Sequence, residues 1–148
     1  MSISKWDIKF INLATEISKW SKDTSTKVGC VIVDDTNRII STGYNGIPIG
    51  CDDSVESRYE KHRKLFYFEH SERNALYSCA YMGKSTKNAT IYVQFYPCAD
   101  CARAIIQCGI KRVVTYKPDF NHERWGESWK VADELFNEVG IEVEFINK

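Results

Sequence analysis

The sequence lacks the features that mark a membrane, secreted or nucleic-acid-binding protein. No stretch approaches the roughly 20 consecutive apolar residues of a membrane span, and charged residues interrupt its first segment, so we expect no membrane contact and no secretory signal. The 20 Lys and Arg residues balance 20 Asp and Glu residues, which leaves a net charge of zero at pH 7. A binder of duplex DNA usually needs a basic excess, so we expect no nucleic-acid partner, whereas a small anionic ligand needs only local cations.

Proline and histidine are scarce, with three residues each, but the chain has six cysteines. An even number of cysteines is typical of a disulfide framework in a small secreted protein. Since no secretory signal is expected and hydrophobic residues make up 43% of the chain, a core can form without disulfides. The cysteines are therefore predicted to be metal ligands or buried thiols in a reducing compartment. We expect a cytoplasmic location, which would be the host cytoplasm for a viral protein.

Helix and strand patterns alternate along the whole chain, without a linker or an internal repeat. Helical spacing of apolar residues predicts a first helix over about 4–20, and β-branched runs at 28–33 and 39–42 predict a hairpin. The remaining helices and strands are predicted at 70–81, 89–95, 97–108, 111–116, 127–138 and 141–146. This order predicts a single domain over 1–148 of the α/β class, a three-layer α-β-α arrangement around a mixed five-stranded sheet.

Two short motifs, each at the start of a predicted helix, carry candidate metal ligands. Cys98 and Cys101 are three residues apart in a first helical turn, so their sulfurs point the same way and can share one ion. The helix N-terminus also favours the thiolate form. Together with His70 they supply three ligands for Zn²⁺, which leaves the fourth tetrahedral position open for water, as in catalytic zinc sites. Bound zinc lowers the pKa of such a water towards neutrality.

Glu72 lies two residues after His70 and is predicted to be a proton shuttle between that water and the substrate rather than a ligand. Residues two apart lie roughly 200° apart on an ideal helix, so both can face one site only if the helix begins there or their rotamers compensate. A structural zinc module is the main alternative, but it usually has a fourth protein ligand and needs no such carboxylate. The two motifs together, H-x-E and P-C-x-x-C, match the signature of zinc deaminases.

Nearly the whole chain, from about residue 6 to 146, resembles the deoxycytidylate (dCMP) deaminases of the cytidine-deaminase superfamily. The resemblance rests on four segments: W-S-K-D-T-S-T-K-V-G at 20–29, G-Y-N-G-I-P-I-G at 43–50, H-S-E-R-N-A at 70–75 and I-I-Q-C-G-I at 105–110. Two residues depart from the family pattern, since Thr24 replaces a proline and Ser71 replaces an alanine. The resemblance implies a cytidine-deaminase-like fold and the hydrolysis of dCMP to dUMP and ammonia, which supplies dUMP for thymidylate synthesis.

The same resemblance implies which residues act. Glu72 would protonate the ring nitrogen of cytosine and then the leaving amine. The substrate would be bound by Lys22, Ser25 and Thr26 at the 5′-phosphate, Asn45 at the deoxyribose hydroxyl and Tyr116 in the pocket wall. From the residues alone, each of these positions can also be structural, as a solvated lysine, a turn amide or a ring packed on the sheet.

Members of the family are often hexamers that dCTP activates and dTTP inhibits, with Mg²⁺ on the effector phosphates. The resemblance implies an effector site in and just after the glycine-rich loop, at Gly46, Ile47, Gly50, Asp52 and Asp53. Backbone amides of such a loop can hold phosphate, and the two carboxylates could reach Mg²⁺, although an acidic solvated turn explains them equally well. We therefore expect a homo-oligomer, in the first place a hexamer, with dCMP as substrate and dCTP and dTTP as effectors.

Two further groups of residues stay open. Cys51 and His62, joined by Cys30 if the fold brings it near, are candidate ligands of a second, structural zinc, whereas Cys79 and Cys108 are predicted to be core. The aromatic segment at 124–129 suits either a subunit contact or a cover over the core.

Two other classes of function are alternatives to dCMP deamination. The substrate could be dCTP in addition to dCMP, cytidine, guanine, a pyrimidine of riboflavin synthesis or adenosine in tRNA, although the zero net charge is unfavourable for a tRNA enzyme. A non-catalytic, zinc-stabilised nucleotide sensor is the third hypothesis. Glu72 argues against it, since a sensor needs no proton shuttle.

Overall fold

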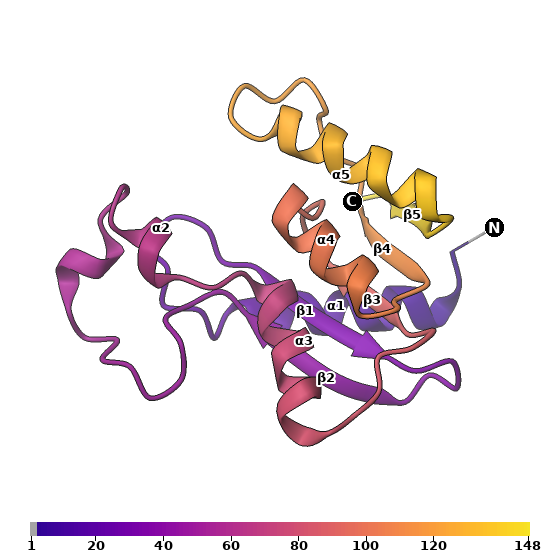
Figure 1. Cartoon of the computed structure of the whole chain (residues 1–148), viewed down its shortest axis with the longest axis horizontal. Coiled ribbons are helices and arrows are strands. Elements are labelled where there is room, and N and C mark those ends of the chain that lie inside the picture. Colours follow the sequence, from indigo (N-terminus) through magenta and orange to yellow (C-terminus); the bar gives the residue numbers. More distant parts are fainter. Residues whose placement is uncertain (1–2) are drawn as a thin grey trace.

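A five-stranded sheet separates two helical layers in the computed structural model, which describes residues 3–148 (Figure 1). The strands are β1 (Gly29–Val33), β2 (Ile39–Tyr44), β3 (Thr90–Val93), β4 (Arg112–Tyr116) and β5 (Glu142–Ile146). They lie in the order β2-β1-β3-β4-β5, in which β1 is antiparallel to both neighbours and β3, β4 and β5 are parallel. The sheet is mixed, as predicted, and the first two residues of the predicted domain lie outside the described residues.

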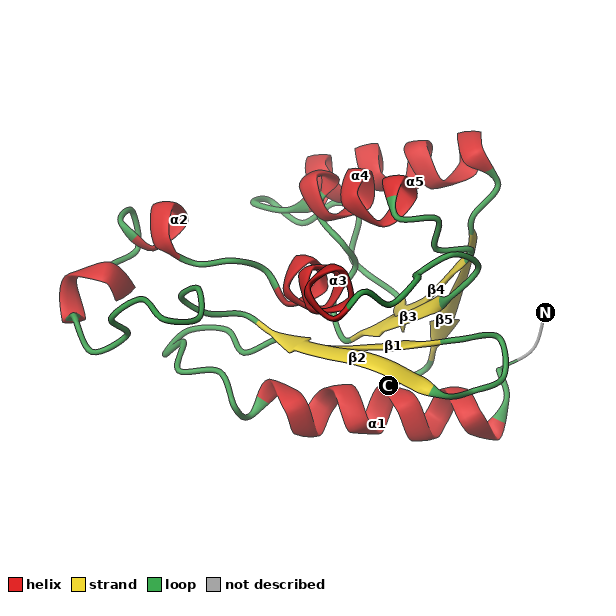
Figure 2. Cartoon of the chain, turned by 60° about the horizontal axis from the view of Figure 1, so that its bottom comes forward, coloured by secondary structure: helices red, strands yellow, loops and turns green. Residues whose placement is uncertain are grey.

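The helices cover both faces of the sheet, which confirms the predicted three layers (Figure 2). Helix α1 (Lys5–Ser18) covers one face, and α3 (Ser71–Met82), α4 (Ala99–Gln107) and α5 (Gly126–Val139) cover the other. Over residues 3–148, no helix is both long and apolar enough to cross a membrane.

The sequence pattern predicted neither of two short helices between β2 and α3. These are the 3₁₀ helix η1 (Glu56–Tyr59) and the single-turn helix α2 (Lys64–Tyr67), which lie apart from the sheet at one end of the molecule (Figure 1). Each has four residues and buries none of them, so there is no apolar periodicity to detect.

Two glycines allow helices to pack directly on the strands. A Cβ atom on Gly29 would lie 1.9 Å from the carbonyl oxygen of Ala14 in α1. A Cβ atom on Gly43 would lie 2.4 Å from the carbonyl oxygen of Ser71 at the start of α3. Since real Cβ contacts are never this short, Gly43 fixes how closely the N-terminus of α3 approaches β2, and Gly29 does the same for α1.

A buried network of charges and hydroxyls joins α1 to the sheet. Arg112 on β4 donates to both carboxylate oxygens of Asp7, at 2.8 and 2.9 Å, and the hydroxyl of Tyr92 donates to the same carboxylate at 2.6 Å. Arg112 also donates to Glu144 on β5 at 3.2 Å. Burial alone would raise the pKa of Asp7, but hydrogen bonds from Arg112, from the backbone of Ser4 and from Tyr92 hold that pKa well below its usual range.

Candidate metal centre and nucleotide site

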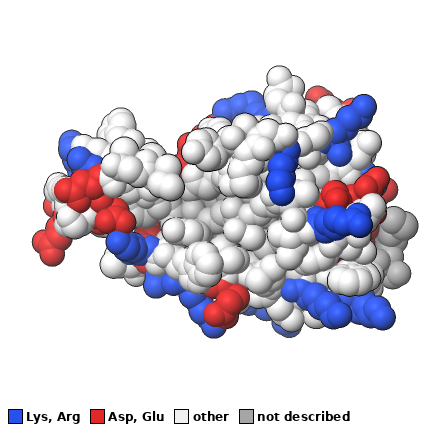
Figure 3. Space-filling model, turned by 90° about the horizontal axis from the view of Figure 1, so that it is seen from below, with Lys and Arg blue, Asp and Glu red and all other residues white. Residues whose placement is uncertain are grey.

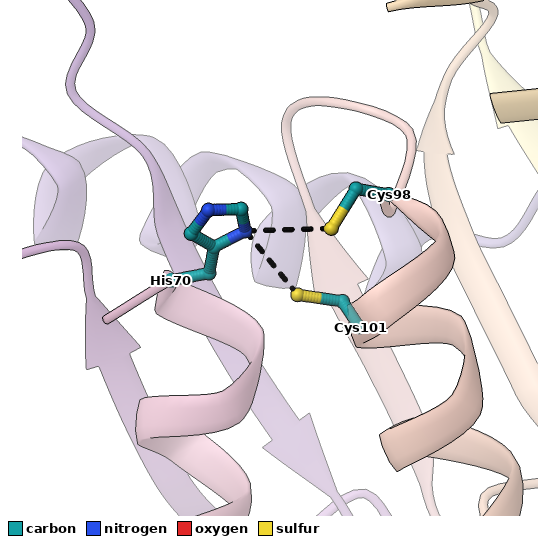
Figure 4. Close-up of side chains that lie close together, drawn as sticks. All are labelled: His70, Cys98 and Cys101. Atoms are coloured by element: carbon teal, nitrogen blue, oxygen red, sulfur yellow. Dashed lines mark hydrogen bonds between the residues drawn. The ribbon is translucent and has the colours of Figure 1, made fainter. Parts of the chain in front are cut away.

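The metal motifs lie at the starts of two neighbouring helices. His70 is the residue just before α3 and Cys98 the residue just before α4, and both have extended backbone conformations. Figure 4 shows the imidazole of His70 facing the sulfurs of Cys98 and Cys101, which belong to the start of α4. Two helix N-termini thus meet at one point, and their partial positive charges favour anionic ligands there.

The distances between these side chains fit a tetrahedral zinc ion. Nδ1 of His70 lies 3.5 Å from Sγ of Cys98 and 3.5 Å from Sγ of Cys101. Ligands bound tetrahedrally at zinc distances of about 2.3 Å for sulfur and 2.0–2.1 Å for nitrogen lie about 3.5 Å apart. Over residues 3–148, these three form the one group of three or more metal-binding side chains whose ligand atoms gather within 4.8 Å. One imidazole and two thiolates are a donor set that zinc prefers.

The thiols of Cys98 and Cys101 are coupled. The hydrogen bond from Cys101 favours the thiolate of Cys98, burial opposes it and His70 supports it, so that the pKa of Cys98 lies well below its usual range. The same hydrogen bond and burial raise the pKa of Cys101. Cys98 is therefore the more acidic of the two thiols.

Glu72 lies close enough to the cluster for the charges of His70 and Cys98 to affect its carboxyl group, and α3 begins at Ser71. His70 is outside the helix, with φ −77° and ψ 153°, so the 200° separation expected for two helical residues does not apply. The Glu72 side chain is buried, and burial raises the pKa of its carboxyl group. The hydroxyl of Ser71 donates to Oε1 of Glu72 at 2.7 Å. The serine that departs from the family pattern therefore fixes one carboxylate oxygen of Glu72.

Arg73 balances the negative charge beside the sulfurs. Its guanidinium donates to Glu69, which in turn accepts the backbone N–H of His70, and it lies 3.9 Å from the carboxylate of Asp100 on α4. The sequence analysis assigns no role to Arg73, although this residue directly follows the H-x-E motif.

The predicted phosphate-binding residues form a surface loop before β1, and the side chains of two of them, Lys22 and Ser25, already have partners. Nζ of Lys22 lies 2.7 Å from Oδ2 of Asp53, so the predicted phosphate cation is paired with a predicted effector-site carboxylate. Oγ of Ser25 accepts a hydrogen bond from Lys64 on α2 at 2.9 Å. Lys64 also binds Asp23, at 3.0 Å. Lys64 is a cation at this loop that sequence reasoning missed, because nothing local in the sequence indicates a contact across 39 residues.

The buried side chain of Asn45, which follows β2, makes three hydrogen bonds to the same loop. Its Oδ1 accepts the N–H of Val28 at 2.9 Å, and its Nδ2 donates to the carbonyl of Thr26 at 2.9 Å and to Asp23 at 3.2 Å. Asn45 therefore holds the shape of the 23–28 segment that contains Ser25 and Thr26. One acceptor lone pair of Oδ1 is left for another donor.

Tyr116 lies on the other face of the sheet from α3 and α4. Its ring packs against the core cluster under α1, and Nζ of Lys148 lies 5.6 Å from the ring centroid. The structure thus shows the packing role for Tyr116 and does not bring it to the cluster of His70, Cys98 and Cys101.

The predicted effector residues lie in the exposed segment after β2. Gly46 forms a backbone bridge with Glu69, and Gly50 has a positive φ of 86°, which favours glycine. Figure 3 shows acidic side chains gathered at this end of the molecule, where Asp52 and Asp53 are exposed. Asp52 accepts hydrogen bonds from the backbone and hydroxyl of Ser54, a local turn.

Among residues 3–148, the candidate ligands of a second zinc, Cys51, His62 and Cys30, do not gather into a metal-binding group. Cys30 is fully buried in the core under α3, whereas Cys51 is exposed. Cys79 is buried and Cys108 packs against the same core, as predicted. In the 124–129 segment, Trp129 packs against the core and stacks on Trp125 at 6.5 Å, which supports a core cover.

Comparisons with known proteins agree with this geometry. Residues 4–117 match the model of the cytidine and deoxycytidylate deaminase zinc-binding region. An uncharacterized deaminase in the luxG 3′ region of Aliivibrio fischeri is 38% identical over 147 residues, which cover 97% of this chain and 95% of that protein. The deoxycytidylate deaminase of Homo sapiens is 34% identical over 145 residues, covering 93% and 77%.

A solved structure extends the similarity to the fold. The dCMP deaminase of the cyanophage S-TIM5, crystallised in complex with dCMP and dUMP, matches with a TM-score of 0.78 and 25% sequence identity. The match covers 99% of this chain and 100% of the cyanophage chain. Its cytidine-deaminase-like fold is thus the fold of this chain.

Proposed function

Because the chain belongs to the cytidine and deoxycytidylate deaminase family, we propose that it hydrolyses dCMP to dUMP and ammonia. The observation that carries this proposal is the cluster of His70, Cys98 and Cys101 at zinc-ligand distances, with the buried carboxyl group of Glu72 beside it. Three ligands leave one position of a tetrahedral ion for water, which a structural site does not need. The similar cyanophage enzyme, crystallised with dCMP and dUMP, supports the choice of substrate.

His70, Cys98 and Cys101 would hold the zinc ion. When bound, zinc supplies a Lewis acid that lowers the pKa of a water molecule. Glu72 would accept a proton from the attacking water and pass it to N3 of cytosine, and a second transfer through Glu72 would protonate the departing amine. The raised pKa of Glu72 suits a group that must both accept and release protons near neutral pH. Ser71 keeps the carboxylate oriented during both transfers by holding Oε1.

The loop before β1 would bind the 5′-phosphate. Lys22 supplies a cation, and Ser25 and Thr26 supply hydroxyl groups, with Lys64 at hydrogen-bond distance from Ser25. The remaining acceptor site on Asn45 is available to the deoxyribose hydroxyl. Tyr116, whose ring packs under α1 on the other face of the sheet, is not part of this proposed nucleotide site.

The proposal extends to regulation and assembly. We propose that dCTP activates and dTTP inhibits the enzyme at Gly46, Ile47, Gly50, Asp52 and Asp53, with Mg²⁺ on the effector phosphates, in a cytoplasmic hexamer. The exposure of both carboxylates is compatible with Mg²⁺ binding, but the support for this part is the family resemblance. Native mass and assays with and without dCTP, dTTP and Mg²⁺ test it independently of the chemistry.

The central test is a deamination assay with dCMP, dCTP, CMP, deoxycytidine and guanine, alongside metal analysis. We expect about one zinc per chain and turnover of dCMP that is lost in Glu72→Ala. Turnover of dCTP alone, or of the free nucleoside alone, would show that Lys22 does not select a monophosphate. Zinc well below one per chain would overturn the metal site, and full activity of Glu72→Ala would overturn the mechanism. Zinc uptake and nucleotide binding without turnover would favour a sensor.

A further inference from the structure

Two side chains of α5 hold the segment that carries Cys98. Oγ of Ser128 accepts the backbone N–H of Ala99 at 2.8 Å, and Oδ1 of Asp133 accepts the hydroxyl proton of Tyr96 at 2.7 Å. Cys98 lies between these two attachment points. We propose that Ser128 and Asp133 are positioning residues that fix the sulfur of Cys98 towards His70. This inference rests on the proposed function, since it takes Cys98 to be a zinc ligand.

The first attachment gives a partner to a backbone N–H at the start of α4. The first N–H groups of a helix have no partner within the helix, and the residue before the helix usually supplies a side-chain oxygen. That residue in α4 is Cys98, whose sulfur is directed at His70 and makes no cap hydrogen bond. From α5, Ser128 supplies an oxygen to the N–H of Ala99, the first residue of α4. One of the unpartnered N–H groups at the start of α4 is thus satisfied without using the side chain that the metal needs.

The second attachment fixes the chain before Cys98. Tyr96 is only 3% exposed and packs among the rings of Phe120, Phe136 and Phe145. A buried hydroxyl without a partner is costly, so the bond to Asp133 selects one position for Tyr96. The ring and hydroxyl together leave the next residues, Pro97 and Cys98, little freedom.

Both positioning residues lie outside the matched zinc-binding region. The family model covers residues 4–117, whereas α5 begins at Gly126. Figure 1 shows α5 running alongside α4 on the same face of the sheet. Gly126 allows the preceding loop to pack on the first turn of α5, because a Cβ atom there would lie 2.4 Å from the carbonyl oxygen of Phe120. Helix α5, which lies outside the matched region, therefore holds the segment that carries Cys98.

The test compares Ser128→Ala with Ser128→Thr and with the control Ser85→Ala. Ser85 also accepts a backbone N–H through its hydroxyl, from Lys87 at 3.2 Å, but in an exposed turn away from the cluster. Zinc affinity is measured by competition with a chromophoric chelator, and ligand geometry by the thiolate-to-metal absorption of Co²⁺-loaded protein. We expect Ser128→Ala to bind zinc about 10–100-fold more weakly, with an altered Co²⁺ spectrum. Ser128→Thr and Ser85→Ala should match the wild type.

Asp133→Ala and Tyr96→Phe provide a second, independent pair, both expected to weaken zinc binding in the same range, because each removes one partner of the hydrogen bond between these side chains. Thermal unfolding of the zinc-free proteins separates positioning from general stability. Wild-type zinc affinity and an unchanged Co²⁺ spectrum in Ser128→Ala and Asp133→Ala would overturn the inference while leaving the proposed function intact. A loss of zinc affinity fully accounted for by unfolding of the zinc-free variants would also overturn it. Failure of the wild type to bind zinc would overturn the proposed metal site and the inference together.

Discussion

His70 and Cys98 occupy equivalent positions in α3 and α4, each the last extended residue before its helix, and their side chains meet at 3.5 Å. Neither side chain caps its own helix. Each helix begins one residue later. The first turn of each contains a second candidate functional residue, Glu72 in α3 and Cys101 in α4. The proposed zinc site is therefore made of two helix starts, and its geometry depends on how these helices are held.

Glu72→Gln should abolish turnover while leaving the metal site intact. The amide keeps the size of the side chain but cannot carry protons, and general acid–base catalysis typically contributes about 10²–10⁴-fold. We expect kcat to fall by at least about 10²-fold, with zinc content unchanged by metal analysis. Ser71→Ala serves as the graded control, because it removes only the hydrogen bond to Oε1 and should lower kcat less. A Glu72→Gln variant with wild-type kcat would contradict the proposed shuttle.

Asp53→Asn should lower the KM for dCMP, and Lys22→Ala should raise it. The carboxylate of Asp53 occupies Lys22 at 2.7 Å, so a phosphate group has to displace it. Both side chains are largely exposed, so we expect only a few-fold change in KM in each direction, with kcat unaffected and the effect diminished at high salt. Deoxycytidine, which lacks the phosphate, is the control substrate and should be insensitive to both changes. Equal effects on both substrates would refute phosphate binding by Lys22.

Gly43→Ala should impair metal binding, whereas Gly29→Ala should impair stability alone. A methyl group on Gly43 would displace the start of α3, which bears His70 and Glu72, and the methyl group on Gly29 would displace α1 on the opposite face. Overpacking of this kind typically costs about 1–3 kcal/mol of unfolding free energy. Denaturant unfolding and zinc competition, measured on both variants, separate the two effects. Equal zinc affinities in the folded fractions would show that α3 tolerates the shift.

Asp7→Asn should destabilise the fold by about 3 kcal/mol near neutral pH, because Arg112 loses its main buried partner. The pKa of Asp7 in the folded chain lies below its ordinary value of 3.8, so its carboxylate stabilises the fold fully above that value. This contribution is lost progressively as the pH falls towards the folded-state pKa. Urea unfolding of both proteins should therefore show a constant difference between about pH 5 and 7 that shrinks below about pH 4. A difference that grows in acid would contradict the sign.

The regular elements were predictable because each carries its own pattern. The structure confirms every helix and strand with an apolar period, including α1 over Lys5–Ser18 and β5 over Glu142–Ile146, with ends that shift by a few residues. The metal cluster was predictable for a related reason, since its ligands sit in two short motifs at predicted helix starts. Whether His70 and Glu72 can serve the same site could not be predicted from the sequence, because it depends on His70 being an extended residue before α3 rather than part of the helix.

The contacts that the sequence did not reveal join segments without a shared pattern. Lys64 reaches Ser25 across 39 residues, from a helix of a single turn. Ser128 reaches Ala99 across 29 residues, and nothing in its neighbours distinguishes it from any exposed serine. Tyr116 is at the end of the expected strand, but the alternation along β4 places its ring under α1. Which face a side chain takes at a strand end depends on register and on the helices that cover it.

The separation of His70 from Cys98 along the chain has a consequence for folding. A metal ion bound to both would close a loop of 28 residues, much as a disulfide does. Closing such a loop removes conformational entropy from the unfolded ensemble whenever the ion stays bound there, and the stabilisation grows only slowly with loop length. The ion would thereby act as a reversible cross-link between the hairpin half of the sheet and its parallel half. Metal supply would then affect the stability of the native state as well as its catalytic competence.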